Sequence, residues 1–309
     1  MEEFIREAEP FLDYADLKVL RAMKRDETVS KSIIKIFENP EYAGKYLIML
    51  KDRPKALFIV AKLSERISKY FKGEEGEAIY NIFLKSVRMI KDTTDTSLKQ
   101  SLFLLVKEAI ERRMNEGDFE TAASLISEFY SFGFKNQFKK ILFTASELAE
   151  KGDFERTIKI LNSLSPSEIV RELRTQIYFE WGKKLFSLKN YTSAEIQLRE
   201  ALKFSENEEI SRETRFVLAE VLRKLGRFEE SYRELSKIEP QNPVEEIKIL
   251  RNAARTLMEW GEFLQKEDAD SAIDKFNEAY QIAMRIGDTS IAEIAFKKAQ
   301  NTLKLKKED

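Results

Sequence analysis

With 309 residues but only 10 glycines and 6 prolines, the chain contains few of the residues that interrupt helices, which favours an all-helical protein. It contains no cysteine and no histidine, which excludes disulfides, thiolate nucleophiles and zinc–sulfur sites, and removes the commonest general base and metal ligand. Lys and Arg number 53 against 54 Asp and Glu, so the chain lacks the basic surplus that is typical of nucleic-acid binders.

The sequence carries no signal for export or membrane insertion. Its first residues are acidic and amphipathic, and they lack the basic start and the apolar core of a signal peptide. No stretch is apolar for the roughly 18–20 residues that a membrane span needs. We therefore expect a cytoplasmic protein. Abundant Lys and Glu without Cys also give a thermophile-like composition, because ion-pair networks become more favourable at high temperature.

Residues 1–95 show the spacing of apolar residues that is typical of helices, but no clear repeat. Ser30 is a candidate cap for the helix that follows it, and this helix is expected to end before Asn39-Pro40. Pro54 fits the first turn of the next long helix. These helices are expected to form degenerate repeats, HEAT-like hairpins or an N-terminal cap, and the sequence does not choose among the three.

The densest cluster of capping and turn residues lies at residues 92–96, with the sequence Asp92-Thr93-Thr94-Asp95-Thr96. We take this cluster as the candidate boundary between an N-terminal helical region, residues 1–95, and a second region, residues 96–309. The alternative is that the cluster forms a single turn between two helices.

Four short turn motifs recur in the second region, and the spacing from one to the next is 35, 37 and 37 residues. Three of them open with a glycine, which suits the left-handed conformation just past a helix end. Asp118 and Asp153 are well placed as N-caps of the helices that follow. The aromatic residue in each motif is expected to pack back onto the first helix. The motifs are Gly117-Asp118-Phe119-Glu120, Gly152-Asp153-Phe154-Glu155, Lys189-Asn190-Tyr191-Thr192 and Gly226-Arg227-Phe228-Glu229.

Bulky and small residues alternate around two of the turns in a way that suits interlocked antiparallel helices. Small residues admit the backbone of the facing helix, and large residues fill the remaining space. The later unit repeats the earlier one through a turn that is one residue shorter. The earlier unit contains Trp181, Gly182, Leu185, Ala194, Leu198 and Ala201, and the later unit contains Trp260, Gly261, Leu264, Ala272, Phe276 and Ala279.

These motifs resemble the tetratricopeptide repeat (TPR), a helix–turn–helix unit of about 34 residues that stacks into a solenoid. The resemblance covers about residues 102–305 and implies an all-α, right-handed α-solenoid, or superhelix, of antiparallel helix hairpins, with about five repeats. Residues 290–305 are expected to form a final helix that shields the last hydrophobic face. Some units depart from the pattern, with Ile110, Thr157 and Ser231 where the family has small residues.

In a TPR array the first helices line a concave groove, and the resemblance carries this role to one mid-helix position in each of four units. That position holds Leu142, Phe179, Phe216 and Met258, and an apolar ladder there would hold an extended or helical peptide. The alternative is that these side chains tilt inward and belong to the core. With their neighbours, the candidate partner-binding residues are Leu142, Phe143, Phe179, Lys183, Phe216, Glu220, Met258 and Glu262.

The chaperone-binding members of the family hold a C-terminal carboxylate with Asn and basic residues on the groove face. Here the matching positions hold Ser146, Lys183, Glu220 and Glu262, with no Asn and two carboxylates, which argues against such a clamp. The alternative to any binding role is a solvated acidic face. A partner with basic residues is favoured by four acidic groove positions, Glu180, Glu220, Glu259 and Glu262.

The expected function is that of a non-enzymatic scaffold or adaptor that binds a protein or peptide in a preorganised groove. No nucleophile motif, phosphate-binding loop or metal constellation is present, so we predict no catalytic residue, no metal and no cofactor. Asp268 and Asp270 lie in a turn without a sufficient ligand set, and Trp181 and Trp260 occupy packing positions. Two alternatives stay open. One is self-association through a terminal helix or the apolar helices before Ile90, and the other is RNA binding, against which the groove glutamates argue.

Overall fold

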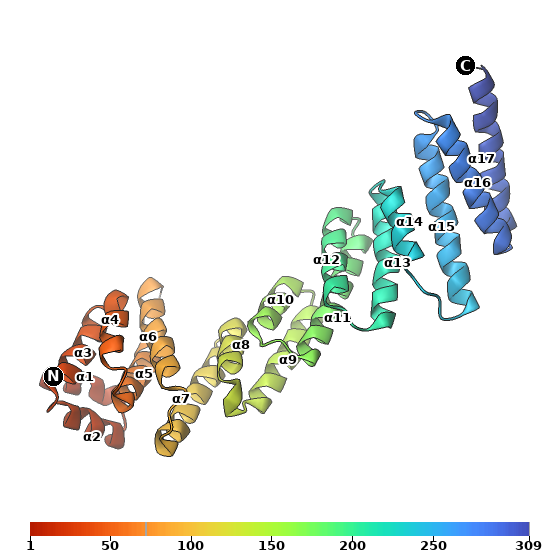
Figure 1. Cartoon of the computed structure of the whole chain (residues 1–309). Helices are drawn as coiled ribbons and strands as arrows, with labels where there is room; N and C mark the ends of the chain where they lie inside the picture. The colour runs from red at the N-terminus through yellow and green to blue at the C-terminus, as the bar shows by residue number, and fades with distance from the viewer. Residues whose placement is uncertain (72, 309) are drawn as a thin grey trace. The chain divides into compact units, whose positions relative to one another are not determined.

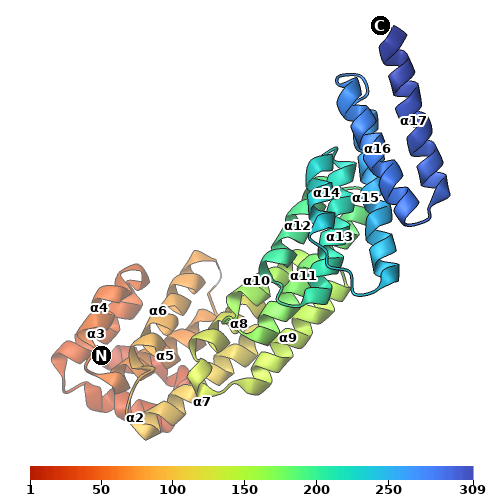
Figure 2. The same cartoon turned by 45° about the vertical axis from the view of Figure 1, so that its right-hand side comes forward.

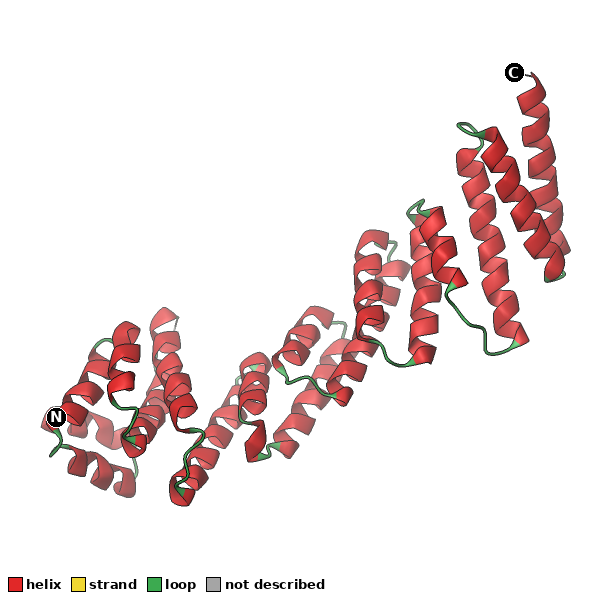
Figure 3. Ribbon diagram, in the orientation of Figure 1, coloured by secondary structure: helices red, strands yellow, loops and turns green. Residues whose placement is uncertain are grey.

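The computed structural model describes residues 1–71 and 73–308, and all regular secondary structure in this part of the chain is helical (Figures 1 and 3). The chain divides into two compact units, Met1–Ile141 and Leu142–Asp309, and the division falls within helix α9 (Lys135–Glu150). The all-α fold that the scarcity of Gly and Pro predicts is confirmed.

The first unit has its core between α5 and α6, which pack along each other. Leu57 and Leu63 on α5 and Phe83 on α6 are fully buried. Pro54 begins α5, and α3 ends at Glu38, as their sequences predict. The helices of this unit are α1 (Glu2–Ala8), α2 (Tyr14–Met23), α3 (Glu27–Glu38), α4 (Ala43–Met49), α5 (Pro54–Ser68), α6 (Glu74–Ile90), α7 (Thr96–Asn115) and α8 (Phe119–Glu128), with 3₁₀ turns η1 (Glu9–Phe11), η2 (Pro40–Tyr42) and η3 (Tyr130–Phe132).

The cap of α3 differs from the expectation. Asp26, rather than Ser30, precedes the helix, and its carboxylate accepts a hydrogen bond of 3.1 Å from the backbone N–H of Val29. Ser30 lies inside the helix, and its hydroxyl donates to the Met23 carbonyl at 3.1 Å. Because Asp is as good an N-cap as Ser, the helix begins at the first capping residue that the chain offers.

The turn expected at residues 92–96 lies between α6 and α7. Asp95 caps α7 there, and its carboxylate accepts a hydrogen bond of 3.0 Å from the backbone N–H of Leu98. The division into regions 1–95 and 96–309 stays a prediction, because the two compact units divide farther along the chain, after Ile141.

The second unit is a series of helix hairpins that follow one another in chain order (Figures 1 and 2). From α10 on, each helix packs against the next one along the chain, most extensively α11 on α12, α15 on α16, and α16 on α17. Its elements after α9 are α10 (Phe154–Ser163), α11 (Glu168–Ser187), α12 (Tyr191–Phe204), α13 (Glu208–Lys224), α14 (Phe228–Ser236), α15 (Pro243–Leu264), α16 (Ala269–Arg285) and α17 (Thr289–Glu308).

The recurrent turns share one hydrogen-bond pattern. The residue after the left-handed position donates its backbone N–H to the carbonyl five residues earlier, as Asn190 does to Leu185 and Arg227 does to Leu222, each at 2.9 Å. This is the Schellman arrangement, which satisfies carbonyls at a helix end. The predicted left-handed conformation is confirmed at Gly117, Gly152 and Gly226, whose φ angles are 80°, 88° and 75°. Lys189 adopts the same conformation in the fourth turn, with a φ angle of 61°.

Lys189 is the one residue other than glycine with a positive φ in the described residues. A residue with a side chain is destabilised in this conformation by about 1–2 kcal/mol. Glycine avoids this strain, but the greater flexibility of its unfolded state lowers the free energy of unfolding by about 0.5–1 kcal/mol. We therefore expect Lys189→Gly to raise the free energy of unfolding by about 0.5–1 kcal/mol, measured by urea denaturation. The matched control is Gly226→Lys, which is expected to lower that free energy by a similar amount. Equal stability of both variants and the wild type would show that the turn carries no strain.

The turn before α16 is shorter by one residue, as the spacing of Gly261 and Ala272 predicts. Asp268 donates its backbone N–H to the Leu264 carbonyl four residues earlier, at 2.8 Å, and no left-handed residue is needed. The Asp268 carboxylate then caps α16 by accepting from the backbone N–H of Ser271 at 3.1 Å.

Two glycines allow the helices of a hairpin to approach closely. A Cβ atom at Gly182 on α11 would lie 2.7 Å from Cδ2 of Leu198 on α12. A Cβ atom at Gly261 on α15 would lie 2.6 Å from Cε1 of Phe276 on α16. The pairing of small with large residues that the sequence predicts is therefore confirmed in both hairpins.

Where the family pattern has an alanine, two hairpins carry a buried hydroxyl instead. The Thr157 hydroxyl donates to the Ala145 carbonyl at 3.2 Å, and the Ser231 hydroxyl donates to the Ala219 carbonyl at 2.7 Å. Both hydroxyl-bearing residues are fully buried. Because each hydroxyl finds a backbone acceptor in the facing helix, these departures do not leave an unpaired polar group in the core.

The aromatic residues of the turn motifs differ in their ring contacts. Tyr191 packs back onto its own hairpin, with its ring centroid 5.8 Å from that of Phe186. Phe154 stacks on Trp181 of the following hairpin, at 5.8 Å between centroids, and Phe228 contacts Phe263 on α15 at the same distance. The contacts of Phe154 and Phe228 with the first helix of the next hairpin were not part of the expectation.

The final helix, α17, covers the last hydrophobic face of α15 and α16, as predicted. Ala292 and Ala295 are buried against α15 and α16, beside Met258 and Tyr280. Lys297 on the same helix is exposed. The helix therefore has one buried face and one charged face, as a capping helix requires.

Candidate functional site

A groove of the second unit runs between α9 and α11. Two hollows of about 690 and 670 Å³ share the residues Ser146, Leu173 and Gln176, so they form one surface, which we call the α9–α11 groove. The loop from α12 to α13 closes one end through Glu206 and Asn207. Because its walls are packed helices, the groove exists without any rearrangement of the chain.

Apolar side chains are exposed in this groove. Phe143 on α9 is 64% exposed and Ile169 on α11 is 58% exposed, although both line the same hollow. Leu142 and Leu173 lie beside them and are half-buried. Two large apolar side chains at one hollow are the kind of surface that takes an apolar side chain from a partner.

The charges of the α9–α11 groove are mostly negative once its ion pairs are taken into account. Arg171 pairs with Glu206, and Lys183 pairs with Glu180 at 3.0 Å. Three further carboxylates line the groove and have no ion-pair partner among the described residues. Lys184 also lines the groove, and its ammonium lies over the Phe154 ring at 5.4 Å. The three carboxylates are Glu150, Glu168 and Glu172.

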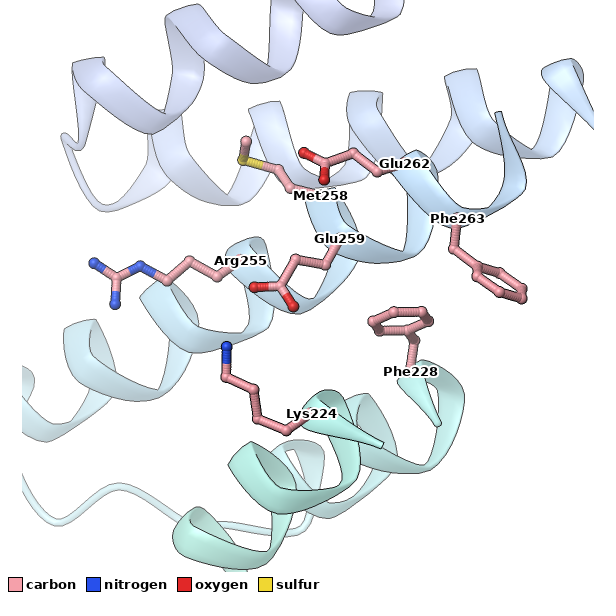
Figure 4. A pocket seen from close by; sticks show the side chains of 7 residues that line it. All are labelled: Lys224, Phe228, Arg255, Met258, Glu259, Glu262 and Phe263. Carbon is pink, nitrogen blue, oxygen red and sulfur yellow. The ribbon is translucent and has the colours of Figure 1, made fainter. Parts of the chain in front are cut away.

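A third hollow, of about 620 Å³, lies between α13 and α15, and we call it the α13–α15 hollow (Figure 4). At one end Phe228 and Phe263 face each other, with ring centroids 5.8 Å apart. At the other end the Lys224 ammonium points from α13 toward the α15 side chains. The α15 residues that line the hollow are Arg255, Met258, Glu259, Glu262 and Phe263.

The structure places the two aromatic members of the predicted apolar ladder, Phe179 and Phe216, in the packing between helices. Phe179 is 6% exposed, and the Lys183 ammonium lies 4.8 Å above the centre of its ring. Phe216 packs against a buried cluster that includes Leu235 and Ile249, and Lys248 covers its ring at 4.2 Å. In this conformation both rings offer a partner little surface, which favours the core interpretation for them.

Five of the other six predicted residues line the α9–α11 groove or the α13–α15 hollow, and Glu220 lines neither. Leu142, Phe143 and Lys183 lie in the α9–α11 groove, and Met258 and Glu262 lie in the α13–α15 hollow. The structure does not bring the eight residues together at one place, and their role in partner binding stays a prediction.

Two functional candidates were missed in the sequence. Ile169 is the second residue of α11, far from the mid-helix positions that the family pattern indicates, and only the fold brings it to the same hollow as Phe143. Phe296 lies 38 residues after Met258 and continues the ladder into α17. Its ring contacts Tyr280 at 5.8 Å and is 48% exposed. The spacing alone could have identified Phe296.

The described residues contain no group of three or more acidic side chains arranged to hold a metal ion. Asp268 caps α16, and Asp270 forms an ion pair with Lys306, so both carboxylates have structural partners. None of the helices in the described part of the chain combines the length and the apolar character that crossing a bilayer requires.

Comparison with known proteins yields similarity in structure only. No protein-family model and no curated protein matches the sequence. The TPR domain of P58(IPK) shares 14% identity, with 99% of this chain and 98% of that chain covered and a TM-score of 0.32. The apo form of the quorum sensor NprR from B. thuringiensis shares 13% identity over 98% and 92%, with a TM-score of 0.28. A circular tandem repeat protein shares 15% over 90% and 69%, with a TM-score of 0.17.

Proposed function

We propose that this chain is a TPR-family protein that acts as a non-enzymatic scaffold or adaptor, and that it binds a protein or peptide segment in the α9–α11 groove. The observation that supports the proposal is the pair of exposed apolar side chains, Phe143 and Ile169, inside a groove with walls of packed helices. Function does not follow from the fold, so the proposal rests on this surface.

The groove would bind its partner through shape and charge. An apolar side chain of the partner would contact Phe143 and Ile169, and a basic side chain beside it would approach Glu168 and Glu172. Ion pairs at an exposed surface contribute only about 0.2–1 kcal/mol each, so the apolar contact would supply most of the affinity and the carboxylates would supply selectivity. Because the helices already hold the groove, little ordering would oppose binding.

The proposal is tested by selecting peptides from a random library on the full chain. We expect the enriched peptides to combine bulky apolar residues with Lys or Arg. Replacing Phe143 by Asp is expected to weaken their binding at least about tenfold, because it removes the central apolar contact. The matched control is Ile196→Asp on α12, where an equally exposed side chain lies outside the groove lining. A library without enriched peptides, or an equal loss in both variants, would contradict the proposal.

Self-association stays an alternative prediction, and the first unit supplies an observation in its favour. Its short helix α4 ends with Ile48 and Met49, both more than half exposed, and Tyr42 in the preceding turn is also exposed.

A cytoplasmic location is likewise still a prediction.

A further inference from the structure

In the α13–α15 hollow, the acidic side chains form ion pairs and the basic side chains do not. Glu259 is bound by Arg223, which comes from α13, and Glu262 is bound by Lys298 of α17 at 2.7 Å. Both carboxylates of the hollow are therefore neutralised by cations that do not line it.

The two cations that line the hollow have no such partner. Lys224 and Arg255 are exposed, and neither forms an ion pair with any residue that the structure describes. Figure 4 places them on the side of the hollow opposite to Phe228 and Phe263. The uncompensated charge of this hollow is therefore positive. The sequence predicts the opposite, an acidic surface, because two of its four groove glutamates, Glu259 and Glu262, line the hollow.

The apolar end of the hollow is available for contact. Phe263 is 60% exposed, and its ring is tilted by 52° to that of Phe228, so the two rings present an apolar corner. An aromatic pair with one exposed and one half-buried ring, next to two unpaired cations, suits a ligand that carries an apolar group and a carboxylate close together.

From this arrangement we infer that the α13–α15 hollow binds an acidic protein segment, whose carboxylates contact Lys224 and Arg255 while a neighbouring apolar side chain contacts Phe228 and Phe263. The inference rests on the proposed function, because it takes the ligand to be a protein segment. It adds a second docking position, with a charge preference opposite to that of the α9–α11 groove.

A nucleic acid fits this hollow less well than an acidic segment. A polyphosphate backbone gains affinity from many cations along its path. Among the described residues that line this hollow, only Lys224 and Arg255 are unpaired cations, and Glu259 and Glu262 line it as well. Two positive charges beside the Phe228 and Phe263 rings match a short peptide in which one or two carboxylates alternate with apolar side chains.

The experiment measures fluorescence anisotropy of two labelled synthetic peptides with the full chain. The acidic peptide alternates Leu and Glu, and the basic peptide carries Lys in place of Glu. We expect the double variant Lys224→Gln/Arg255→Gln to weaken binding of the acidic peptide at least about tenfold, since both of its charged contacts are lost. Glutamine keeps the side chains polar and similar in length, and circular dichroism checks that the helices remain folded.

Two matched variants separate this site from its surroundings. Lys297→Gln/Lys304→Gln on α17 removes the same charge at exposed positions outside the hollow, and it should leave binding of the acidic peptide unchanged. Glu168→Gln/Glu172→Gln should weaken only the basic peptide, because these carboxylates line the α9–α11 groove.

Several outcomes would overturn the inference. Equal binding of the acidic peptide by wild type and by Lys224→Gln/Arg255→Gln would do so, as would tighter binding of a single-stranded oligonucleotide of the same length. If wild type binds only the basic peptide, the inference fails and the proposed function stands. If wild type binds neither peptide and the library selection also fails, the proposed function fails as well.

Discussion

Replacing Phe179 by Asp is expected to unfold much of the second unit, with a loss of at least about 3–5 kcal/mol in the free energy of unfolding. The ring is 6% exposed and lies beneath Lys183. Removing a buried phenyl ring leaves a cavity, and the aspartate would also place a charge where it has no buried partner. Urea denaturation followed by circular dichroism measures the effect.

The control for this prediction lies on the neighbouring first helix. Phe143→Asp introduces the same change on α9, at a side chain that is 64% exposed. Its free energy of unfolding should stay within about 0.5 kcal/mol of the wild-type value, since no buried contact is lost. A Phe179→Asp variant that is as stable as Phe143→Asp would show that the Phe179 ring faces the groove, as the family pattern suggests.

Replacing Gly261 by Ala is expected to lower the free energy of unfolding by about 1–3 kcal/mol, although alanine forms helices better than glycine. The new methyl group would lie 2.6 Å from Cε1 of Phe276, which is fully buried and cannot move aside without displacing its neighbours. The gain in helix propensity, about 0.5–1 kcal/mol, is smaller than this cost. Thermal and urea denaturation of the full chain measure the net change.

A double variant tests the cause of that loss. Phe276→Leu makes room at the contact and destabilises the chain on its own, but it should reduce the cost of adding Gly261→Ala. A positive coupling between the two changes identifies the close approach of α15 and α16 as the reason for glycine. Strictly additive effects, or an alanine variant more stable than wild type, would contradict it.

Local interactions made most of the second unit's fold predictable from the sequence. The left-handed turn depends on a glycine or a tolerated substitute just past the helix end, so its spacing marked Gly117, Gly152 and Gly226. The contact of Gly261 with Phe276 follows from helical periodicity and a short turn. The left-handed conformation of Lys189 was not predicted from the sequence, since lysine itself disfavours it.

The charge of the candidate surfaces could not be predicted, because it depends on pairs between helices that lie far apart in the sequence. Glu259 and Glu262 resemble free acids in the sequence, but Arg223 and Lys298 neutralise them. The reason to expect a basic partner therefore moves to other residues, Glu150, Glu168 and Glu172, in the α9–α11 groove. The division of the chain after Ile141 has no turn motif or composition change to mark it.

The apolar ladder shows a related limit of prediction from sequence. Periodicity indicates which residues share a face of a helix, but not whether a neighbouring helix covers that face. Phe179 and Phe216 share the position of Leu142, and lysines lie over both aromatic rings. Phe143, one residue along α9, is the exposed one.

The most direct test of protein binding by the second unit is photo-crosslinking from position 143. A benzophenone amino acid would replace Phe143 in the full chain, expressed in the cells from which the protein comes, and a second variant would carry it at Ile196. We predict a defined adduct from position 143, mapped to an apolar and basic segment of the captured protein, and none from position 196. The same adducts from both positions, or none from either, would contradict a binding role for the α9–α11 groove.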